Sequence, residues 1–267
     1  MPKHENTQRI NPNNLREGLH EFPDTPEVYW TDGSLDASEK FGRLGIANEL
    51  GLDLHDLVCF SQLNHTNEVV VVDSADSLTV LYPIYEDAVE KARLVVEGGW
   101  SEPIRPYQTD AEKGAERRTY DGIIMVAGPG LENKHLLVTG ADCTPIGIRA
   151  KLKSGEEVIA VAHGGRRGTI TGIIDNLASR LQFLGIVPST AEIFVGPAAQ
   201  DIEVPLGLLA TESTVENPRP DNSWQASSVS ERYTDEDGVT KVRYDNQFDT
   251  TRRVIEALGV SGDQVTV

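Results

Sequence analysis

The hydrophobic positions of this chain fall into short apolar runs and a few amphipathic segments. Runs rich in Val and Ile, bounded by Gly, Pro and charged residues, are typical of buried strands. They predict strands over residues 57–63, 68–73, 122–127, 134–143, 145–152, 156–163 and 192–197, and a last short one over 264–267. Apolar residues at three- and four-residue steps predict helices over residues 42–53, within 76–97, from Thr169 to Leu184, and over 245–260.

Strands and helices alternate along the whole chain, which indicates an α/β layered fold with a mixed sheet. Residues 1–30 show no clear periodicity and are predicted to form an extended arm. A chain of 267 residues can bury one large core or two small ones, and we expect a single domain over 31–267. Residues 98–120 are polar and predict a surface excursion, and residues 211–240 show no core pattern.

The charge and hydropathy of the chain exclude several classes of protein. Its net charge of −18 and its pI near 4.7 argue against a nucleic-acid or anionic-membrane surface, because those surfaces need basic stripes. No apolar run is long enough for a membrane helix, and the first residues lack the apolar core of a secretory signal. We therefore expect a cytoplasmic protein whose partners are small molecules.

Candidate metal ligands stand where apolar runs break. The chain has only two cysteines, too few for a disulfide framework, and Cys59 lies inside an apolar run. Cys143, His65 and His163 each stand in or beside a turn next to a strand-like run. Thiolate and neutral imidazole are ligands that Zn²⁺ prefers, and three protein ligands leave one position open. Each residue taken alone is also compatible with a purely structural role.

A glycine-rich turn leads from the predicted strand 156–163 into the helix that follows. Such a turn brings backbone N–H groups and the positive end of a helix dipole close to a ligand. An arginine beside it can add a bidentate contact to a phosphate. The candidate phosphate or substrate site consists of Gly164, Gly165, Arg166, Arg167, Gly168 and Thr169. The alternative is a glycine turn chosen for backbone shape, with both arginines solvated.

Four central segments of the chain carry a set of motifs: DGIIMVAGPG, HLLVTGADCTPIGI, VIAVAHGGRRGTITGII and EIFVGPAAQDIEV. Together these segments resemble the laccase-domain family, which is also named polyphenol oxidoreductase, purine nucleoside phosphorylase or peptidoglycan editing factor. They match the family's D-A-[ILV]-[ILV]-T, T-A-D-C-x-P, A-H-A-G-W-R-G-T and G-P motifs in the same order. Upstream, LNHTNEV resembles the family's Q-V-H-G-x-x-V and places His65 on its histidine. The resemblance covers residues 41–74, 121–204 and 244–267.

The resemblance implies a single-domain α/β/β/α layered sandwich with mixed sheets. It implies a Zn²⁺ held by His65, Cys143 and His163, and phosphorolysis of adenosine or inosine. Arg167 would then hold phosphate, while Asp142 would orient a histidine or transfer a proton. It also implies adenosine deamination, by attack of water at C6. Copper chemistry is less expected, because a multicopper centre needs many more histidines than the 6 present.

The chain departs from the family pattern in ways that leave alternatives open. Arg166 replaces the motif Trp, Thr66 replaces a glycine, and residues 76–120 form an insertion. The family pattern also continues past the position of Val267 into an aromatic, arginine-rich segment. One alternative is a hydrolase of amide or muropeptide bonds with Cys143 as nucleophile and His163 as base. The other is a catalytically degenerate protein that binds metal or nucleoside without turnover.

Overall fold

The computed structural model describes residues 19–21, 28–31, 40–53, 56–59, 65–78, 120–140, 142–199, 202–206 and 229–267. The chain divides into two compact units, Met1–Leu57 and Val58–Val267. In the first unit, strand β1 (Leu19–Glu21) pairs antiparallel with β2 (Tyr29–Thr31). The helix predicted over 42–53 is confirmed as α1, Lys40–Glu49.

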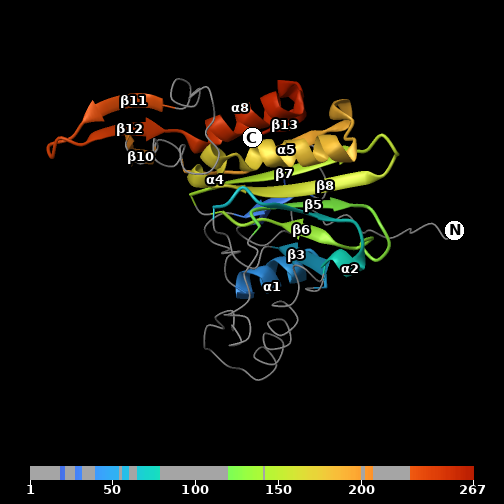
Figure 1. Cartoon of the computed structure of the whole chain (residues 1–267). Coiled ribbons are helices and arrows are strands. Elements are labelled where there is room, and N and C mark those ends of the chain that lie inside the picture. The colour runs from blue at the N-terminus through green and yellow to red at the C-terminus, as the bar shows by residue number, and fades with distance from the viewer. Residues whose placement is uncertain are drawn as a thin grey trace, which may run out of the picture. The chain divides into compact units, whose positions relative to one another are not determined.

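The second unit is built on a mixed six-stranded sheet in the order β13-β9-β7-β8-β5-β4 (Figure 1). Its outer pairs, β13 with β9 and β5 with β4, are parallel, and the pairs between them are antiparallel. Its strands are β4 (Val69–Val72), β5 (Gly122–Val126), β7 (Thr144–Lys151), β8 (Glu157–Gly164), β9 (Glu192–Val195) and β13 (Val265–Thr266). The predicted strands of this sheet are thus confirmed, and its mixed topology agrees with the predicted α/β class.

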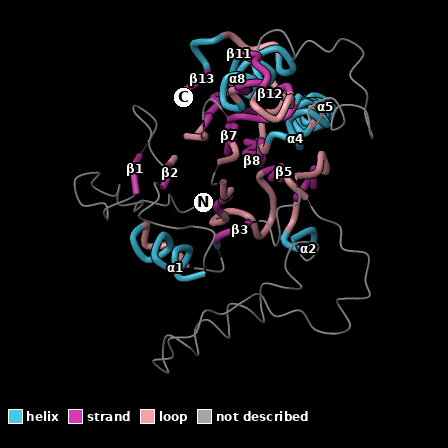
Figure 2. Tube along the Cα trace, turned by 90° about the vertical axis from the view of Figure 1, so that its left-hand side faces the viewer, coloured by secondary structure: helices cyan, strands magenta, loops and turns pink. Residues whose placement is uncertain are grey.

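Helices α5 (Ile173–Leu184) and α8 (Asn246–Leu258) cover one face of this sheet (Figure 2). Alternate residues of each strand point to this face, so Ile146, Ile148 and Ala150 of β7 join a core with the apolar stripes of both helices. The opposite face carries Ile123 and Met125 of β5, packed in a second cluster. That cluster includes residues of a small sheet formed by β3 (Leu57–Cys59) and β6 (His135–Leu137), and of the short helix α2 (Ala75–Leu78).

The helix predicted from Thr169 differs from the one observed. It begins earlier, as α4 (Arg166–Thr171), and Gly172 separates α4 from α5. Gly172 has a φ of 101°, which is open to glycine but strained for other residues, and this breaks the helix. The predicted end at Gly185 is confirmed, because this residue also adopts a left-handed conformation and its N–H bonds back to the last turn.

Residues 211–240 show no core pattern in the sequence, and none of the residues 231–240 is buried, yet strands are present from Val229 onward. Strand β11 (Val229–Thr234) pairs with β12 (Thr240–Tyr244), and β12 pairs with β10 (Ile202–Pro205). This three-stranded antiparallel sheet buries Val204, Val242 and Tyr244 against Ile170 of α4. Its hairpin is otherwise polar, as expected for strands with one face in water.

Several predictions lie outside the described residues. They concern most of the helix within 76–97, most of the excursion at 98–120, and most of the arm at 1–30.

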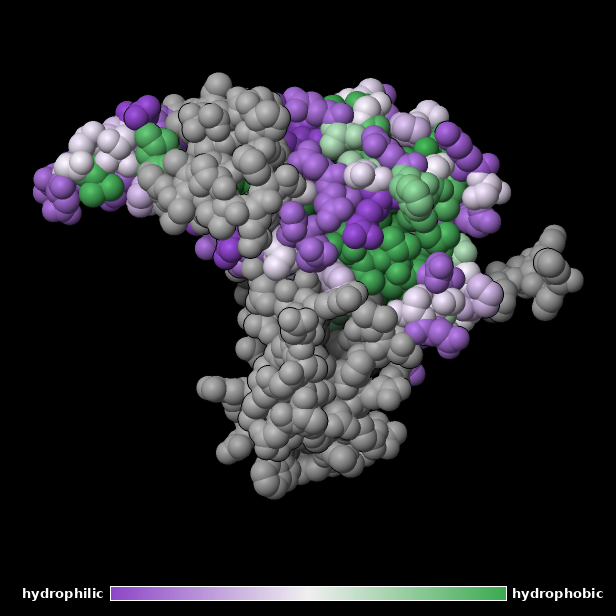
Figure 3. Space-filling view, in the orientation of Figure 1, coloured by the Kyte–Doolittle hydropathy of each residue, from purple (hydrophilic) through white to green (hydrophobic). Residues whose placement is uncertain are grey.

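None of the described helices is long and apolar enough to cross a membrane. Short 3₁₀ turns at Pro188–Thr190 and Gly262–Gln264 complete the described fold. Figure 3 shows a hydrophobic patch below the polar helical surface, over the area where Figure 1 labels β5 and β8.

Candidate metal centre

The strand register brings the three predicted metal ligands to one end of the six-stranded sheet. Cys143 directly precedes β7, and His163 lies at the end of β8, where it pairs with Pro145 of β7. Gly122 of β5 pairs with both Ala162 of β8 and Val69 of β4, so the segment before β4 reaches the same end of the sheet. His65 lies in that segment. Three positions far apart in sequence therefore meet because the sheet is mixed.

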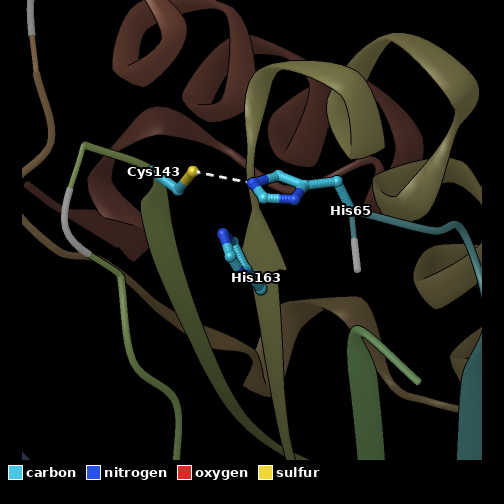
Figure 4. Close-up of side chains that lie close together, drawn as sticks. All are labelled: His65, Cys143 and His163. Carbon is cyan, nitrogen blue, oxygen red and sulfur yellow. Dashed lines mark hydrogen bonds between the residues drawn. The ribbon is translucent and has the colours of Figure 1, made fainter. Parts of the chain in front are cut away.

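The side chains of His65, Cys143 and His163 converge, as the close-up shows (Figure 4). Their candidate ligand atoms all lie within 4.8 Å of one another. The Sγ atom of Cys143 is 3.4 Å from Nε2 of His65, and the centroids of the two imidazole rings are 4.9 Å apart. One sulfur and two imidazole nitrogens at this spacing can surround a single ion the size of Zn²⁺. The described residues contain no second group of this kind.

Burial shifts the pKa values of two of the three candidate ligands, His163 and Cys143. The pKa of His163 is lowered to about 4, mainly by burial and secondly by the charge of His65, while the charge of Asp121 partly opposes this shift. Burial also raises the pKa of the Cys143 thiol, as does the charge of Asp142. The backbone N–H and the charge of Arg166 oppose that rise. At neutral pH the site therefore offers the neutral imidazole of His163, and a thiol that must lose its proton to bind a metal.

Two observations indicate that this site is shaped for an ion. His163 is only 4% exposed, and neither of its ring nitrogens has a hydrogen-bond partner. A buried polar atom without a partner is costly, and a metal on one nitrogen would relieve part of that cost. In addition, a Cβ atom on Gly165 would overlap the ring of His65 and lie 3.1 Å from Cys143 Sγ. Only glycine leaves this space open, so the donor set and the space around it both fit a metal.

Asp121, the residue directly before β5, borders both histidines. It is fully buried, and its Oδ1 accepts a hydrogen bond from the backbone N–H of His65 at 3.2 Å. Its Oδ2 accepts bonds from the N–H and the hydroxyl of Thr66, each at 2.7 Å. The same carboxylate lies 3.7 Å from Nδ1 of His163, which is too long for a hydrogen bond but close enough for its charge to raise the pKa of that ring.

Asn246, the first residue of α8, borders the other side of the site. Its amide nitrogen donates to the Thr144 hydroxyl at 2.8 Å and to the Gly164 carbonyl at 2.6 Å. Thr144 follows Cys143 and Gly164 follows His163, so this one amide ties together the strand ends that carry two of the three candidate ligands. Asn246 is fully buried, which makes these two bonds costly to lose.

The predicted phosphate-site residues differ in burial and in their contacts with the candidate ligands. Gly164 and Gly165 are buried beside it, and Arg166 reaches Cys143 through its backbone N–H. Arg167 is exposed, while Gly168 and Thr169 are buried. The Thr169 hydroxyl lies 3.4 Å from that of Thr250 in α8, which places it on the helix-packing side.

The sequence alone indicates no role for Asp121, Thr66 or Asn246, although Asp121 stands at the aspartate of the motif D-A-[ILV]-[ILV]-T. The predicted carboxylate, Asp142, is exposed, and its effect in the structure is on the Cys143 thiol. The signal that could have identified Asp121 is a charged residue placed directly before a fully apolar strand, where burial of the charge requires partners. For Asn246 that signal is absent, because a polar first residue of a helix is ordinary.

Comparisons with known proteins bear on the family and the fold of this chain. The family model described as multi-copper polyphenol oxidoreductase laccase matches residues 36–266. The Bacillus licheniformis hypothetical protein YfiH has a similar structure, with a TM-score of 0.52 and 19% identity over 84% of this chain and 67% of that one. YlmD from Geobacillus stearothermophilus gives a TM-score of 0.51 and 19% identity, over 85% and 67%. No curated protein shows significant sequence similarity to this chain.

The two structural likenesses bear on the fold alone, because the sequence identities are low. The family model, by contrast, spans most of the chain, including His65, Cys143 and His163. This chain is a member of the multi-copper polyphenol oxidoreductase laccase family.

Proposed function

We propose that this protein is a zinc-dependent enzyme that processes purine nucleosides, by phosphorolysis of adenosine or inosine and by deamination of adenosine. The observation that carries the proposal is the convergence of His65, Cys143 and His163 within 4.8 Å. Family membership supports it, since the laccase-domain family also bears the name purine nucleoside phosphorylase. Two free cysteines suit a reducing compartment such as the cytoplasm.

The donor set favours zinc over copper. One thiolate and two imidazoles match the ligands of catalytic zinc sites, which keep a fourth position open for water or substrate. A multicopper centre would need several further imidazoles, whereas the whole chain has 6 histidines. When bound, the metal would supply Lewis acidity toward an oxygen or nitrogen atom of the substrate.

The chain's own residues would bind the second substrate. Arg167 is exposed in the first turn of α4, and Arg166 places a second positive charge beside Cys143. In a chain of net charge −18, this pair offers a local attraction for phosphate. In phosphorolysis a phosphate oxygen forms a bond to ribose C1′ while the bond from C1′ to the purine nitrogen breaks. The purine leaves with the bond electrons and takes up a proton from water, and the exposed Asp142 beside Cys143 is the proposed residue that passes this proton on.

Nucleoside turnover tests the proposal. Zinc-loaded protein is incubated with adenosine or inosine, with and without inorganic phosphate, and the products are separated by chromatography. We expect release of adenine or hypoxanthine only when phosphate is present, and formation of inosine from adenosine by deamination. The Cys143→Ala variant should give neither base release nor deamination. Arg167→Ala should raise the KM for phosphate while leaving zinc affinity unchanged. Absence of both products from fully zinc-loaded protein would contradict the proposal.

A second function is favoured by one observation, the 3.4 Å distance between Cys143 Sγ and His65 Nε2. A thiol beside an imidazole is the arrangement of cysteine hydrolases, and here the neighbouring base is His65 rather than the predicted His163. The raised pKa of Cys143 counts against this function, because it lowers the fraction of reactive thiolate. Metal-free protein that cleaves amide or muropeptide bonds, and loses this activity on adding zinc, would support the hydrolase.

A further inference from the structure

The hydrogen-bond and ion-pair partners of the buried Asp121 carboxylate lie in the two segments that carry His65 and His163. The residue has no exposed surface, and none of the hydrogen bonds or ion pairs of its side chain in the described structure involves a lysine or arginine. A buried charge normally requires close pairing, because its removal from water is costly. Here the partners are two backbone N–H groups, one hydroxyl and one imidazole. All of them belong to His65, Thr66 or His163.

The first consequence concerns the backbone at His65. Its φ of 55° is the only positive φ of a non-glycine residue in the described parts of the chain. Such a conformation is disfavoured for a side chain with a Cβ and persists only where neighbouring contacts enforce it. The contacts at this position are the bonds from the His65 and Thr66 N–H groups to the two oxygens of Asp121. Together they fix the turn that directs the imidazole toward Cys143.

The second consequence concerns the ring of His163. Its Nδ1 faces Oδ1 of Asp121 at 3.7 Å, and its backbone N–H donates to the Asp121 carbonyl at 2.8 Å. A carboxylate near Nδ1 favours the tautomer that carries its proton there, which leaves Nε2 as the free lone pair. This would present Nε2 of His163, like Nε2 of His65, to a metal.

From these contacts we propose that Asp121 is the positioning residue of the metal centre, setting the backbone of His65 and the tautomer of His163 through one carboxylate. Cys143 reaches the site independently, through β7. Asp121 thus takes the orienting role that was one of two roles implied for Asp142 by the family resemblance. The inference rests on the metal-binding part of the proposed function and not on its nucleoside chemistry.

The test is the zinc affinity of Asp121→Asn, measured by competition with a chelating dye. The asparagine has the same shape, but its NH₂ group must replace one of the two oxygens. If the NH₂ group replaces Oδ2, it faces the N–H of Thr66. If it replaces Oδ1, it faces the N–H groups of His65 and His163. In both cases a hydrogen-bond donor faces another donor. Loss of such a partner of a metal ligand lowers metal affinity by about 10- to 100-fold. We expect a loss in that range.

Two matched variants separate positioning from general stability. Asp249→Asn changes another fully buried carboxylate, bonded to Tyr244 and Arg253 in and near α8, and should leave zinc affinity unchanged. Thr66→Val removes the hydroxyl that donates to Asp121 and accepts from the N–H of Glu68, without touching His163, and should give an intermediate loss. In zinc-loaded, ¹⁵N-histidine-labelled protein, the Nδ1 proton of His163 should be observed by NMR. Its chemical shift should change in Asp121→Asn only.

Distinct results would overturn the proposal. Zinc affinity of Asp121→Asn within about twofold of wild type would do so, since the expected loss is at least about tenfold. An equal loss in Asp249→Asn would do so too. Coordination of zinc by Nδ1 of His163 in the wild-type protein would contradict it even if Asp121→Asn failed to fold. None of these measurements depends on turnover, so a failure of the nucleoside chemistry would be seen separately.

Discussion

Replacing Gly165 with alanine should abolish tight metal binding without unfolding the protein. Gly165 stands between β8 and α4 with ordinary extended angles, φ −65° and ψ 151°, so alanine causes no backbone strain there. The effect comes from space alone. The added Cβ would overlap Cδ2 of His65 and lie 3.0 Å from its Nε2 and 3.1 Å from Cys143 Sγ.

The size of the effect follows from the distances. Non-bonded carbon atoms normally stay about 3.5 to 4.0 Å apart, so the His65 ring must move by more than about 1 Å. Zinc ligands tolerate deviations of only about 0.2 Å from their ideal bond lengths. His65 would therefore be lost as a ligand. We expect zinc affinity to fall by at least about 100-fold, the upper range for losing a residue that only supports a ligand.

The assay is zinc competition with a chelating dye, together with the absorption of the Co²⁺-loaded protein, whose thiolate band reports on Cys143. The matched control is Gly147→Ala in β7, where the added Cβ would lie at ordinary contact distances of 3.5 Å or more from Phe194. Circular dichroism and the Tm of both metal-free variants check that the fold is kept. Wild-type zinc affinity in a folded Gly165→Ala protein would refute the assignment of His65 as a ligand.

Three further predictions concern stability. Asn246→Ala removes the hydrogen bonds to Thr144 and Gly164. It should lower the free energy of unfolding, measured by urea titration, by about 1–3 kcal/mol, and it should also weaken zinc binding. An unchanged free energy of unfolding together with unchanged zinc affinity would contradict the bridging role. The folded pKa of His163 is about 4, below its ordinary value of 6.5, so the unfolded chain binds more protons between these values. Metal-free protein should therefore lose stability as pH falls from 6.5 to 4, by up to a few kcal/mol, and His163→Gln should flatten this slope in denaturant titrations at each pH. Zinc at about 100 times its Kd should raise the free energy of unfolding by about 2.7 kcal/mol, and Cys143→Ala should remove the gain.

The strands and most helices could be predicted because their signals are local. The strand at 144–151 alternates between buried and partly exposed positions, and the apolar stripe of α5 recurs at helical steps. The break at Gly172 could not be predicted, since a glycine inside a helical pattern is often tolerated. The hairpin of β11 and β12 was missed because its polar residues face water, and few apolar ones mark its buried side.

The ligand set could be predicted from residue types and motif resemblance, but its supporting residues could not. Whether Asp121 or Asp142 faces His163 depends on strand register, which brings residue 122 beside residue 162. Asn246 acts across 102 positions of sequence from Thr144, and no local pattern encodes that contact. Such polar contacts form only when the whole sheet and α8 are in place, so they follow from the fold rather than from any segment.

X-ray absorption at the zinc edge of the purified, zinc-loaded protein tests the central claim most directly. The account predicts one zinc per chain with one sulfur neighbour at about 2.3 Å and two imidazole nitrogens at about 2.0–2.1 Å. The sulfur neighbour should disappear in Cys143→Ala, and one imidazole should disappear in His65→Ala. A zinc shell of oxygen and nitrogen alone, or a protein that retains no zinc, would contradict the metal centre described here.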